Sequence, residues 1–277
     1  MDTGGERTDP TGGLAIEAGV MAAQDAVSRL VIWFDQHGAD LPWRRTRDRY
    51  AVLISEVMLQ ATQVSRVVPF FERWMERWPT PQTLAAAPLG QVLAAWNGLG
   101  YPRRARNLQR AAAIVATHGW PERLQELPGV GSYTAAAIAC FADEQDVLPV
   151  DVNVRRVLAR RWPDGWPGAP TDRVWDAGQA LMDLGRVMCT ARAPACDLGC
   201  PLRAGCPAAD AGQVAEVTPP GRRQSRYLGS MRQRRGRLLA AIAAEGRVDL
   251  TSDPEAAQSL VVDGLARRGR LYLLPAR

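Results

Sequence analysis

Apolar residues recur at helical spacing along most of the chain. This spacing predicts helices over residues 22–36, 50–63, 65–78, 83–96, 104–118, 132–141, 154–161 and 172–188. Pro69 falls in the first turn of its predicted helix, where proline is tolerated. No convincing alternation of apolar and polar residues, the mark of a half-buried strand, occurs before residue 245. The pattern therefore predicts a mainly α-helical core.

The helical pattern is interrupted at Pro219-Pro220-Gly221. Beyond it, the sequence predicts helices over 231–245 and 254–268 and a short β-like tail, LYLLP. That order resembles a small winged-helix module, a type that often binds DNA; a helical cap packed on the core is the alternative. We expect a disordered leader (1–26), a core (27–218) and this module (219–277).

Composition narrows the class of protein. No apolar run in the 277 residues approaches the roughly 18 needed to span a bilayer, and the N-terminus lacks a signal pattern, so we expect a cytoplasmic, nucleoid-associated protein. The net charge is +5 and is carried by arginine, which suits phosphate binding. Arginines cluster at 103–106, 155–156, 160–161 and 232–237. These clusters predict either a nucleic-acid surface or merely solvated arginine faces.

The segment LPGVGSYTA, residues 127–135, places two glycines immediately before a predicted helix. A helix N-terminus carries unpaired N–H groups and a partial positive charge, and glycine lets another backbone approach closely. Gly129, Val130 and Gly131 could therefore bind a DNA phosphate in a helix–hairpin–helix motif. An ordinary turn between two helices is the alternative.

Several motifs in one order carry a family resemblance. The segments are LPWR (41–44), SEVMLQATQV (55–64), WNGLGYPRRARNL (96–108), LPGVGSYTA (127–135), VDVNVRRVL (150–158), QALMDLG (179–185) and the cysteine segment 189–206. Together they resemble the helix–hairpin–helix DNA glycosylases of the endonuclease III superfamily, and most closely the MutY-type adenine glycosylases. The resemblance covers roughly residues 27–210.

Two carboxylates have the chemistry that such an enzyme needs. Glu56 lies mid-helix among apolar neighbours, which would raise its pKa and keep a proton available to protonate adenine. Asp151 could stabilise positive charge developing on the sugar, or it could simply cap the helix that follows. The resemblance favours catalytic roles for both and implies that Asn153 positions Asp151 and the sugar.

Tyr133 stands where the resemblance places an attacking lysine in bifunctional relatives. A tyrosine cannot form a Schiff base, so the chain is expected to remove a base without cutting the strand. The resemblance also implies an adenine pocket lined by Trp43, Arg44 and Gln179, with Gln60 among the substrate-binding residues. Leu99 and Tyr101 would wedge into the duplex. Core packing is the alternative for Trp43 and Tyr101.

Four cysteines, Cys189, Cys196, Cys200 and Cys206, have six, three and five residues between them. Four close cysteines in a cytosolic protein favour a metal centre over disulfides. The resemblance implies a 4Fe–4S cluster, whose usual spacing is six, two and five; structural zinc is the alternative. We expect a bulge in Asp197-Leu198-Gly199 to absorb the extra residue.

The sequence departs from the resembled family at three places. Ala61 replaces a second glutamine, Pro102 replaces a second tyrosine, and the C-terminal segment is too short for a nudix-like domain. We expect a monomeric, monofunctional glycosylase that acts on adenine opposite 8-oxoguanine or guanine in double-stranded DNA. The alternatives are a mismatch thymine or uracil glycosylase and a non-catalytic DNA-binding relative.

Overall fold

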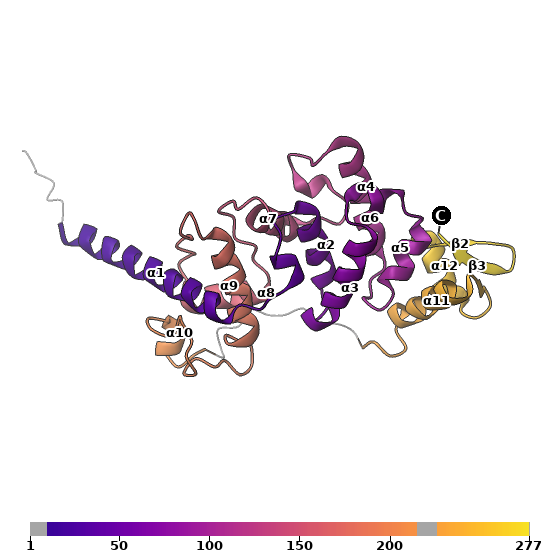
Figure 1. Cartoon of the computed structure of the whole chain (residues 1–277). Coiled ribbons are helices and arrows are strands. Elements are labelled where there is room, and N and C mark those ends of the chain that lie inside the picture. Colours follow the sequence, from indigo (N-terminus) through magenta and orange to yellow (C-terminus); the bar gives the residue numbers. More distant parts are fainter. Residues whose placement is uncertain (1–9, 215–225, 277) are drawn as a thin grey trace, which may run out of the picture. The chain divides into compact units, whose positions relative to one another are not determined.

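The computed structural model describes residues 10–214 and 226–276, with side chains from residue 21 onward. It is mainly helical, as predicted. The helices are α1 (Pro10–His37), α2 (Arg49–Leu59), α3 (Val64–Arg77), α4 (Pro81–Ala86), α5 (Leu89–Trp96), α6 (Arg103–His118), α7 (Ser132–Phe141), α8 (Val152–Arg161), α9 (Val174–Val187), α10 (Pro207–Asp210), α11 (Met231–Glu245) and α12 (Pro254–Val262) (Figure 1). Two short 3₁₀ turns, η1 (Pro42–Arg44) and η2 (Leu124–Glu126), complete the helical elements.

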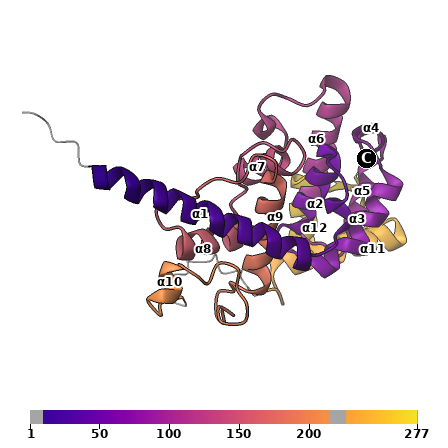
Figure 2. The same cartoon turned by 60° about the vertical axis from the view of Figure 1, so that its left-hand side comes forward.

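Helix α1 corrects the expected leader. It begins at Pro10 and runs without interruption to His37, so residues 10–26 are helical rather than disordered (Figure 2). The C-terminal half of α1 is anchored because Ala26, Val27 and Leu30 are fully buried. Residues 1–9 lie outside the described residues.

Contacts within the described part of the chain divide it into two compact units. The first lies within residues 1–39 and 139–221, and the second within 40–138 and 222–277. This division differs from the expected single core with an appended module, because the C-terminal residues group with the middle of the chain. The expected boundary at 218–219 lies outside the described residues.

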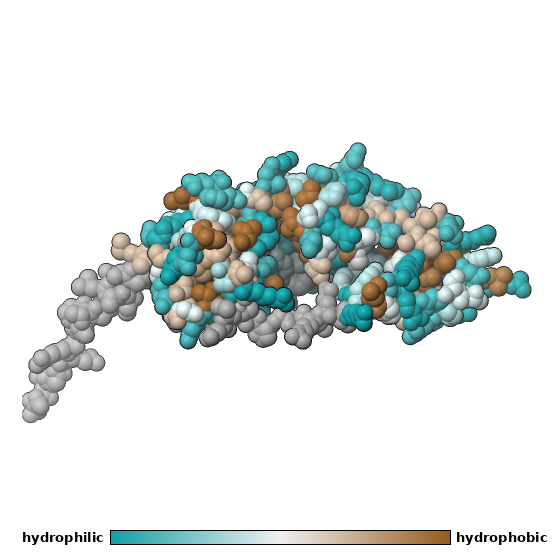
Figure 3. Space-filling model, turned by 90° about the horizontal axis from the view of Figure 1, so that it is seen from below, coloured by the Kyte–Doolittle hydropathy of each residue, from teal (hydrophilic) through white to brown (hydrophobic). Residues whose placement is uncertain are grey.

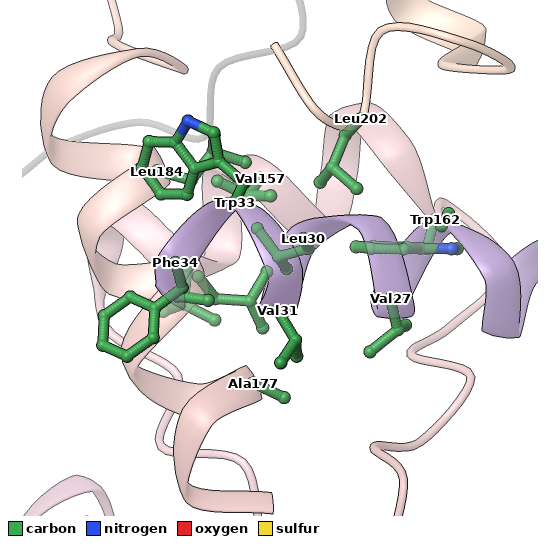
Figure 4. Packing of buried hydrophobic residues seen from close by; sticks show 14 residues of the cluster. Val27, Leu30, Val31, Trp33, Phe34, Val157, Trp162, Ala177, Leu184 and Leu202 are labelled. Atoms are coloured by element: carbon green, nitrogen blue, oxygen red, sulfur yellow. The ribbon is translucent and has the colours of Figure 1, made fainter. Parts of the chain in front are cut away.

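The first unit packs α1 and α8 against α9. Its core includes apolar side chains from all three helices, such as Leu30, Phe34, Val157 and Leu184 (Figure 4). The same cluster includes Leu202 of the cysteine segment, so this segment is packed against the core of the unit. Burial of these side chains provides the main stabilisation of the unit.

The second unit is built around α2, whose residues Tyr50–Met58 are all buried. Asp48 caps this helix by accepting hydrogen bonds from the backbone N–H groups of Tyr50 and Ala51. The helix predicted over 83–96 is divided into α4 and α5, because Pro88 lacks the N–H that a continuous helix requires.

The C-terminal residues of the second unit form the order helix, strand, helix, hairpin. Strands β1 (Val248–Asp249), β2 (Ala266–Arg268) and β3 (Tyr272–Pro275) make an antiparallel sheet in the order β1-β3-β2. The register pairs Val248 with Leu273 and Arg267 with Leu274. The second predicted helix therefore ends earlier than expected, at Val262. Helix α11 packs on α5. We call residues 226–276 the C-terminal module.

None of the helices in the described residues has the length and apolar character that crossing a bilayer requires. On the face drawn in Figure 3, hydrophobic residues form small separate groups among hydrophilic ones. Exposed apolar side chains scattered in this way are ordinary for a protein surface.

Candidate active site and cysteine centre

Glu56 lies near the end of α2 and is 6% exposed. The side chains one turn before it, Val52 and Leu53, are also buried. The glutamate therefore lies in the buried part of α2, as its apolar neighbours in the sequence indicate. A surface glutamate on an amphipathic helix, the ordinary alternative, is wrong for this position.

The pocket residues predicted in the second unit differ in how deeply they are buried. Trp43 is buried in η1 and meets the ring of Phe71 edge-on, with the centroids 5.4 Å apart. Arg44, the next residue, is half-buried, as is Gln60 at the end of α2. Trp43 thus has a packing role in the core, whatever it does for a substrate.

The glycine hairpin combines a left-handed backbone conformation with an exposed glycine before α7. Gly129 has φ +84°, in the region that favours glycine, while Val130 donates a hydrogen bond to the Leu127 carbonyl at 3.0 Å. Gly131 is exposed, and a Cβ added to it would meet nothing within 4 Å. Among the described residues, the N–H groups of Gly129 and Gly131 donate no hydrogen bond. The half-buried Tyr133 follows in the first turn of α7.

Leu99 and Tyr101, the predicted wedges, lie in the loop between α5 and α6. Leu99 is buried, whereas Tyr101 is 39% exposed and has φ +50°. Gly98 and Gly100 also have positive φ values. Consecutive residues in this region make a sharply folded loop that presents the Tyr101 ring at the surface.

Arg104 holds this loop to the end of α2. Its guanidinium donates to the carbonyls of Val57 at 2.6 Å, Gln60 at 2.8 Å and Leu99 at 3.0 Å, and also to that of Gly100. Burial lowers the pKa of Arg104 to about 10. The cation therefore binds carbonyls at the C-terminus of a helix, where a positive charge is favourable.

In the first unit, Asp151 caps α8. One carboxylate oxygen accepts hydrogen bonds from the backbone N–H groups of Asn153 at 2.8 Å and Val154 at 2.7 Å. The other oxygen accepts from the Asn153 side-chain amide at 3.1 Å. The capping role is therefore confirmed, and Asn153 does orient the carboxylate. A catalytic role for the same carboxylate stays a prediction.

A buried arginine connects this cap with the cysteine segment. Arg156 donates to the Asn153 side-chain oxygen at 2.9 Å, to the Gly185 carbonyl at 2.5 Å and to the Cys189 carbonyl at 2.7 Å. A Cβ on Gly185 would lie 2.9 Å from the Cβ of Asn153, so only glycine lets α9 come this close. Gln179, also on α9, is buried.

The four clustered cysteines line one cavity, together with Arg160, Arg161 and apolar residues of α8 and α9. None of the described cysteines is in a disulfide. The predicted bulge is present: Gly199 has φ +88° and Leu198 turns outward, 79% exposed. The extra residue is thereby absorbed without moving Cys196 and Cys200 away from the cavity.

The donor set of this cavity suits a thiophilic metal centre. Burial raises the pKa of the Cys196 thiol, and raises that of Cys200 to about 11. The guanidinium of Arg160 lies 3.3 Å from the Cys189 sulfur. As the side chains stand, no three His, Cys, Asp or Glu residues of the described chain make a ready metal-binding group.

The interpretation of the arginine clusters as a nucleic-acid surface is wrong for several members. Arg156 and Arg160 are buried at the cysteine segment, and Arg104 binds backbone carbonyls. In α11, Arg234 pairs with Asp253 and Glu255. Sequence reasoning missed these structural arginines, although the four-residue spacing of 156 and 160, on one helix face, was a usable signal.

The predicted site residues thus fall in two groups. The second unit carries Trp43, Arg44, Glu56, Gln60, Leu99, Tyr101, the hairpin and Tyr133. The first unit carries Asp151, Asn153, Gln179 and the four cysteines.

The helical fold, the hairpin and the two carboxylates define the class of protein. The family model of the HhH-GPD superfamily of base excision DNA repair proteins matches residues 54–170. Among solved structures, a thermostable thymine-DNA glycosylase is 26% identical and has a TM-score of 0.61 over 67% of this chain and 95% of its own. A trapped endonuclease III–DNA covalent intermediate, at 24% identity and a TM-score of 0.58 over 70% of this chain and 98% of its own, shares the fold.

Curated relatives narrow the class further. The adenine DNA glycosylase of Mycolicibacterium smegmatis is 40% identical over 86% of this chain and 92% of its own length. That of Mycobacterium tuberculosis is 41% identical over 87% and 90%, and the human enzyme is 41% identical over 64% and 38%. The chain therefore belongs to the adenine DNA glycosylase family.

Proposed function

We propose that this protein hydrolyses the N-glycosidic bond of adenine mispaired with 8-oxoguanine or guanine in double-stranded DNA. The observation that carries the proposal is the buried Glu56 on an apolar helix, in a chain about 40% identical to adenine DNA glycosylases. A carboxyl in such surroundings can act as a general acid near neutral pH.

The two carboxylates have complementary roles in this reaction. Glu56 protonates the ring of the flipped adenine, and the bond between C1′ and the base then breaks with its electron pair going to the base. Asp151 stabilises the positive charge left on the sugar until water adds to C1′ and releases a proton to solvent. Asn153 orients Asp151 through the hydrogen bond described above. Trp43, Arg44, Gln60 and Gln179 contact the base.

The reaction ends at an abasic site because the chain offers no side-chain amine. Position 133 is tyrosine, and the whole sequence contains no lysine. Strand cleavage through a Schiff base needs such an amine as nucleophile. The DNA backbone is therefore left intact, and a later enzyme must process the product.

DNA is held by the hairpin and distorted by the wedges. The N–H groups of Gly129 and Gly131, in the turn just before α7, bind a phosphate without reading sequence. Tyr101 and Leu99 offset the loss of stacking when the base leaves the duplex. The protein acts as a monomer in the cytoplasm, where it associates with the nucleoid.

Cys189, Cys196, Cys200 and Cys206 hold a 4Fe–4S cluster, which suits their common cavity and the arginines beside it. When bound, this cluster supplies a structural crosslink of the segment 189–206. Structural zinc is the alternative, since four thiolates also suit zinc.

A second candidate function is excision of thymine or uracil from mismatches. The likeness to a thymine-DNA glycosylase favours it, and so does Ala61, which stands with φ +54° where the family usually has glutamine. We favour adenine as the excised base because the adenine DNA glycosylases match more of this chain, and at higher identity, than the thymine-DNA glycosylase does.

A duplex panel tests the proposal. Adenine, thymine or uracil is placed opposite 8-oxoguanine or guanine, and base release is measured in single turnover with and without alkali. Adenine release, strand cuts only after alkali, and no borohydride-trapped adduct are expected. Release of thymine or uracil in place of adenine would transfer the assignment to the second candidate.

A further inference from the structure

Tyr101 is fixed from the core side by Arg104. The guanidinium of Arg104 lies 5.4 Å from the centroid of the Tyr101 ring and 5.3 Å from that of Trp96. Because Arg104 also binds the carbonyls of Val57, Gln60 and Leu99, it has little freedom to move away. One face of the exposed tyrosine is therefore braced.

A second arginine, from the C-terminal module, reaches the same ring. Arg232 on α11 donates a hydrogen bond to the Tyr101 hydroxyl at 2.7 Å, and its guanidinium lies 5.5 Å from the ring centroid. The same guanidinium lies 5.1 Å from the ring of Tyr227, which is half exposed. The module thus contacts Tyr101 at its hydroxyl end.

The position of Arg232 does not depend on Tyr101, because a buried carboxylate anchors the module separately. Asp263, 6% exposed, accepts from Arg103 of α6 at 2.8 Å and from Arg235 of α11, and its backbone carbonyl accepts from Arg106. This anchor joins α6 to both helices of the module. Arg232 therefore reaches Tyr101 from a helix that contacts other than its own hold in position.

We propose that Arg232 is a positioning residue for DNA distortion: it holds the Tyr101 ring in one orientation before DNA arrives. The inference deepens the proposed function, since it depends on Tyr101 acting as a wedge. A tyrosine side chain that is already ordered loses less conformational freedom on insertion between bases, so a larger share of complexes has the target base unstacked. The C-terminal module thereby takes part in base flipping through one side chain.

The test replaces Arg232 by methionine, which keeps the length of the side chain and removes the hydrogen bonds and charge. Two readouts are taken on a mismatched duplex: the fluorescence of 2-aminopurine beside the target adenine, which reports unstacking, and the single-turnover rate of adenine release at saturating enzyme. Arg232→Met is expected to lower both by about tenfold. Arg232→Lys keeps a cationic donor and is expected to recover most of the unstacking.

Arg237→Met is the matched control, because Arg237 is an exposed arginine of the same helix. It removes the same charge and is expected to leave both readouts unchanged. Adding Arg232→Met to Tyr101→Ala is expected to have no further effect, because the ring that Arg232 positions is already absent. Equal melting temperatures of the single variants verify that the module stays folded.

Two results would overturn the proposal. One is the same unstacking signal in Arg232→Met and Arg237→Met, whether both match wild type or both are reduced. The other is a full additional loss when Arg232→Met is added to Tyr101→Ala. Failure of the proposed function looks different. In that case the wild-type protein releases no adenine, or Tyr101→Ala unstacks the duplex as well as wild type does.

Discussion

In the proposed mechanism, the chemical step depends most directly on the buried Glu56. Glu56→Gln keeps the size of the side chain and removes the transferable proton, so single-turnover adenine release is expected to fall by at least about 100-fold. Affinity for mismatched DNA, measured by fluorescence anisotropy, is expected to change little. Glu72→Gln, at an exposed glutamate of α3, is the control. Release by the Glu56 variant within tenfold of wild type would remove this carboxyl from the mechanism.

At the scale of elements, substitutions at the two hairpin glycines are expected to have different effects. One variant should weaken DNA binding, and the other should lower the stability of the fold. Gly131 has room for a side chain in the free protein, so Gly131→Val is expected to melt like wild type while blocking the approach of a phosphate. Affinity for duplex DNA is expected to fall by about tenfold or more, whatever the mismatch, with a shallower dependence on salt. Both are measured by anisotropy titrations at several salt concentrations.

Gly129→Ala is the contrasting variant. Gly129 has φ +84°, and an added Cβ would lie 3.0 Å from the Cβ of Asn107, so this change is expected to destabilise the fold by about 1–2 kcal/mol. Equal melting temperatures for the two variants would contradict the geometry described for the hairpin.

The attachment of the C-terminal module is expected to depend on pH through Asp263. Its hydrogen bond and ion pair with Arg103, aided by Arg235, hold the pKa of this carboxyl below its ordinary value. The stabilisation is therefore complete above about pH 4 and is lost as the pH falls through the lowered pKa. Asp263→Asn is expected to unfold the module more easily at pH 7, and its difference from wild type is expected to shrink as the pH falls below about 4. Denaturant titrations followed by hydrogen exchange in α12 measure both. A difference that stays the same size as the pH falls below about 4 would exclude the carboxylate as its source.

Elements were predictable where local signals were strong. The hairpin glycines, the cap at Asp151 and the Gly199 bulge each depend on a few neighbouring residues, and the structure has all three. The burial of Arg156 and Arg160 was not predictable in this way, because it depends on carbonyls at Gly185, Cys189 and Thr190 that lie about 30 residues away. Contacts of Arg232 with Tyr101 span 131 residues and leave no local pattern at all.

At the scale of the whole molecule, the cysteine centre is the component whose chemistry is most open to measurement. Protein purified without oxygen is expected to be brown and to contain about four iron atoms per chain. Colourless protein that contains one zinc atom would show that the cysteines hold structural zinc instead of a 4Fe–4S cluster. The description of the fold would be unaffected. Because Arg156 joins the Cys189 carbonyl to Asn153, removal of the metal is expected to lower the rate of base release more than the affinity for DNA.

The backbone of Tyr101 has a consequence for how such a protein can evolve. A non-glycine residue at φ +50° costs roughly 1–2 kcal/mol relative to an unstrained position, whereas glycine adopts this conformation freely. Backbone strain alone therefore favours glycine at position 101, and under the proposed function the wedge role of the ring is what retains tyrosine there. A library evolved for heat resistance without a repair assay is expected to lose this side chain early. The resulting proteins are expected to be more thermally stable and to bind DNA without removing its lesions.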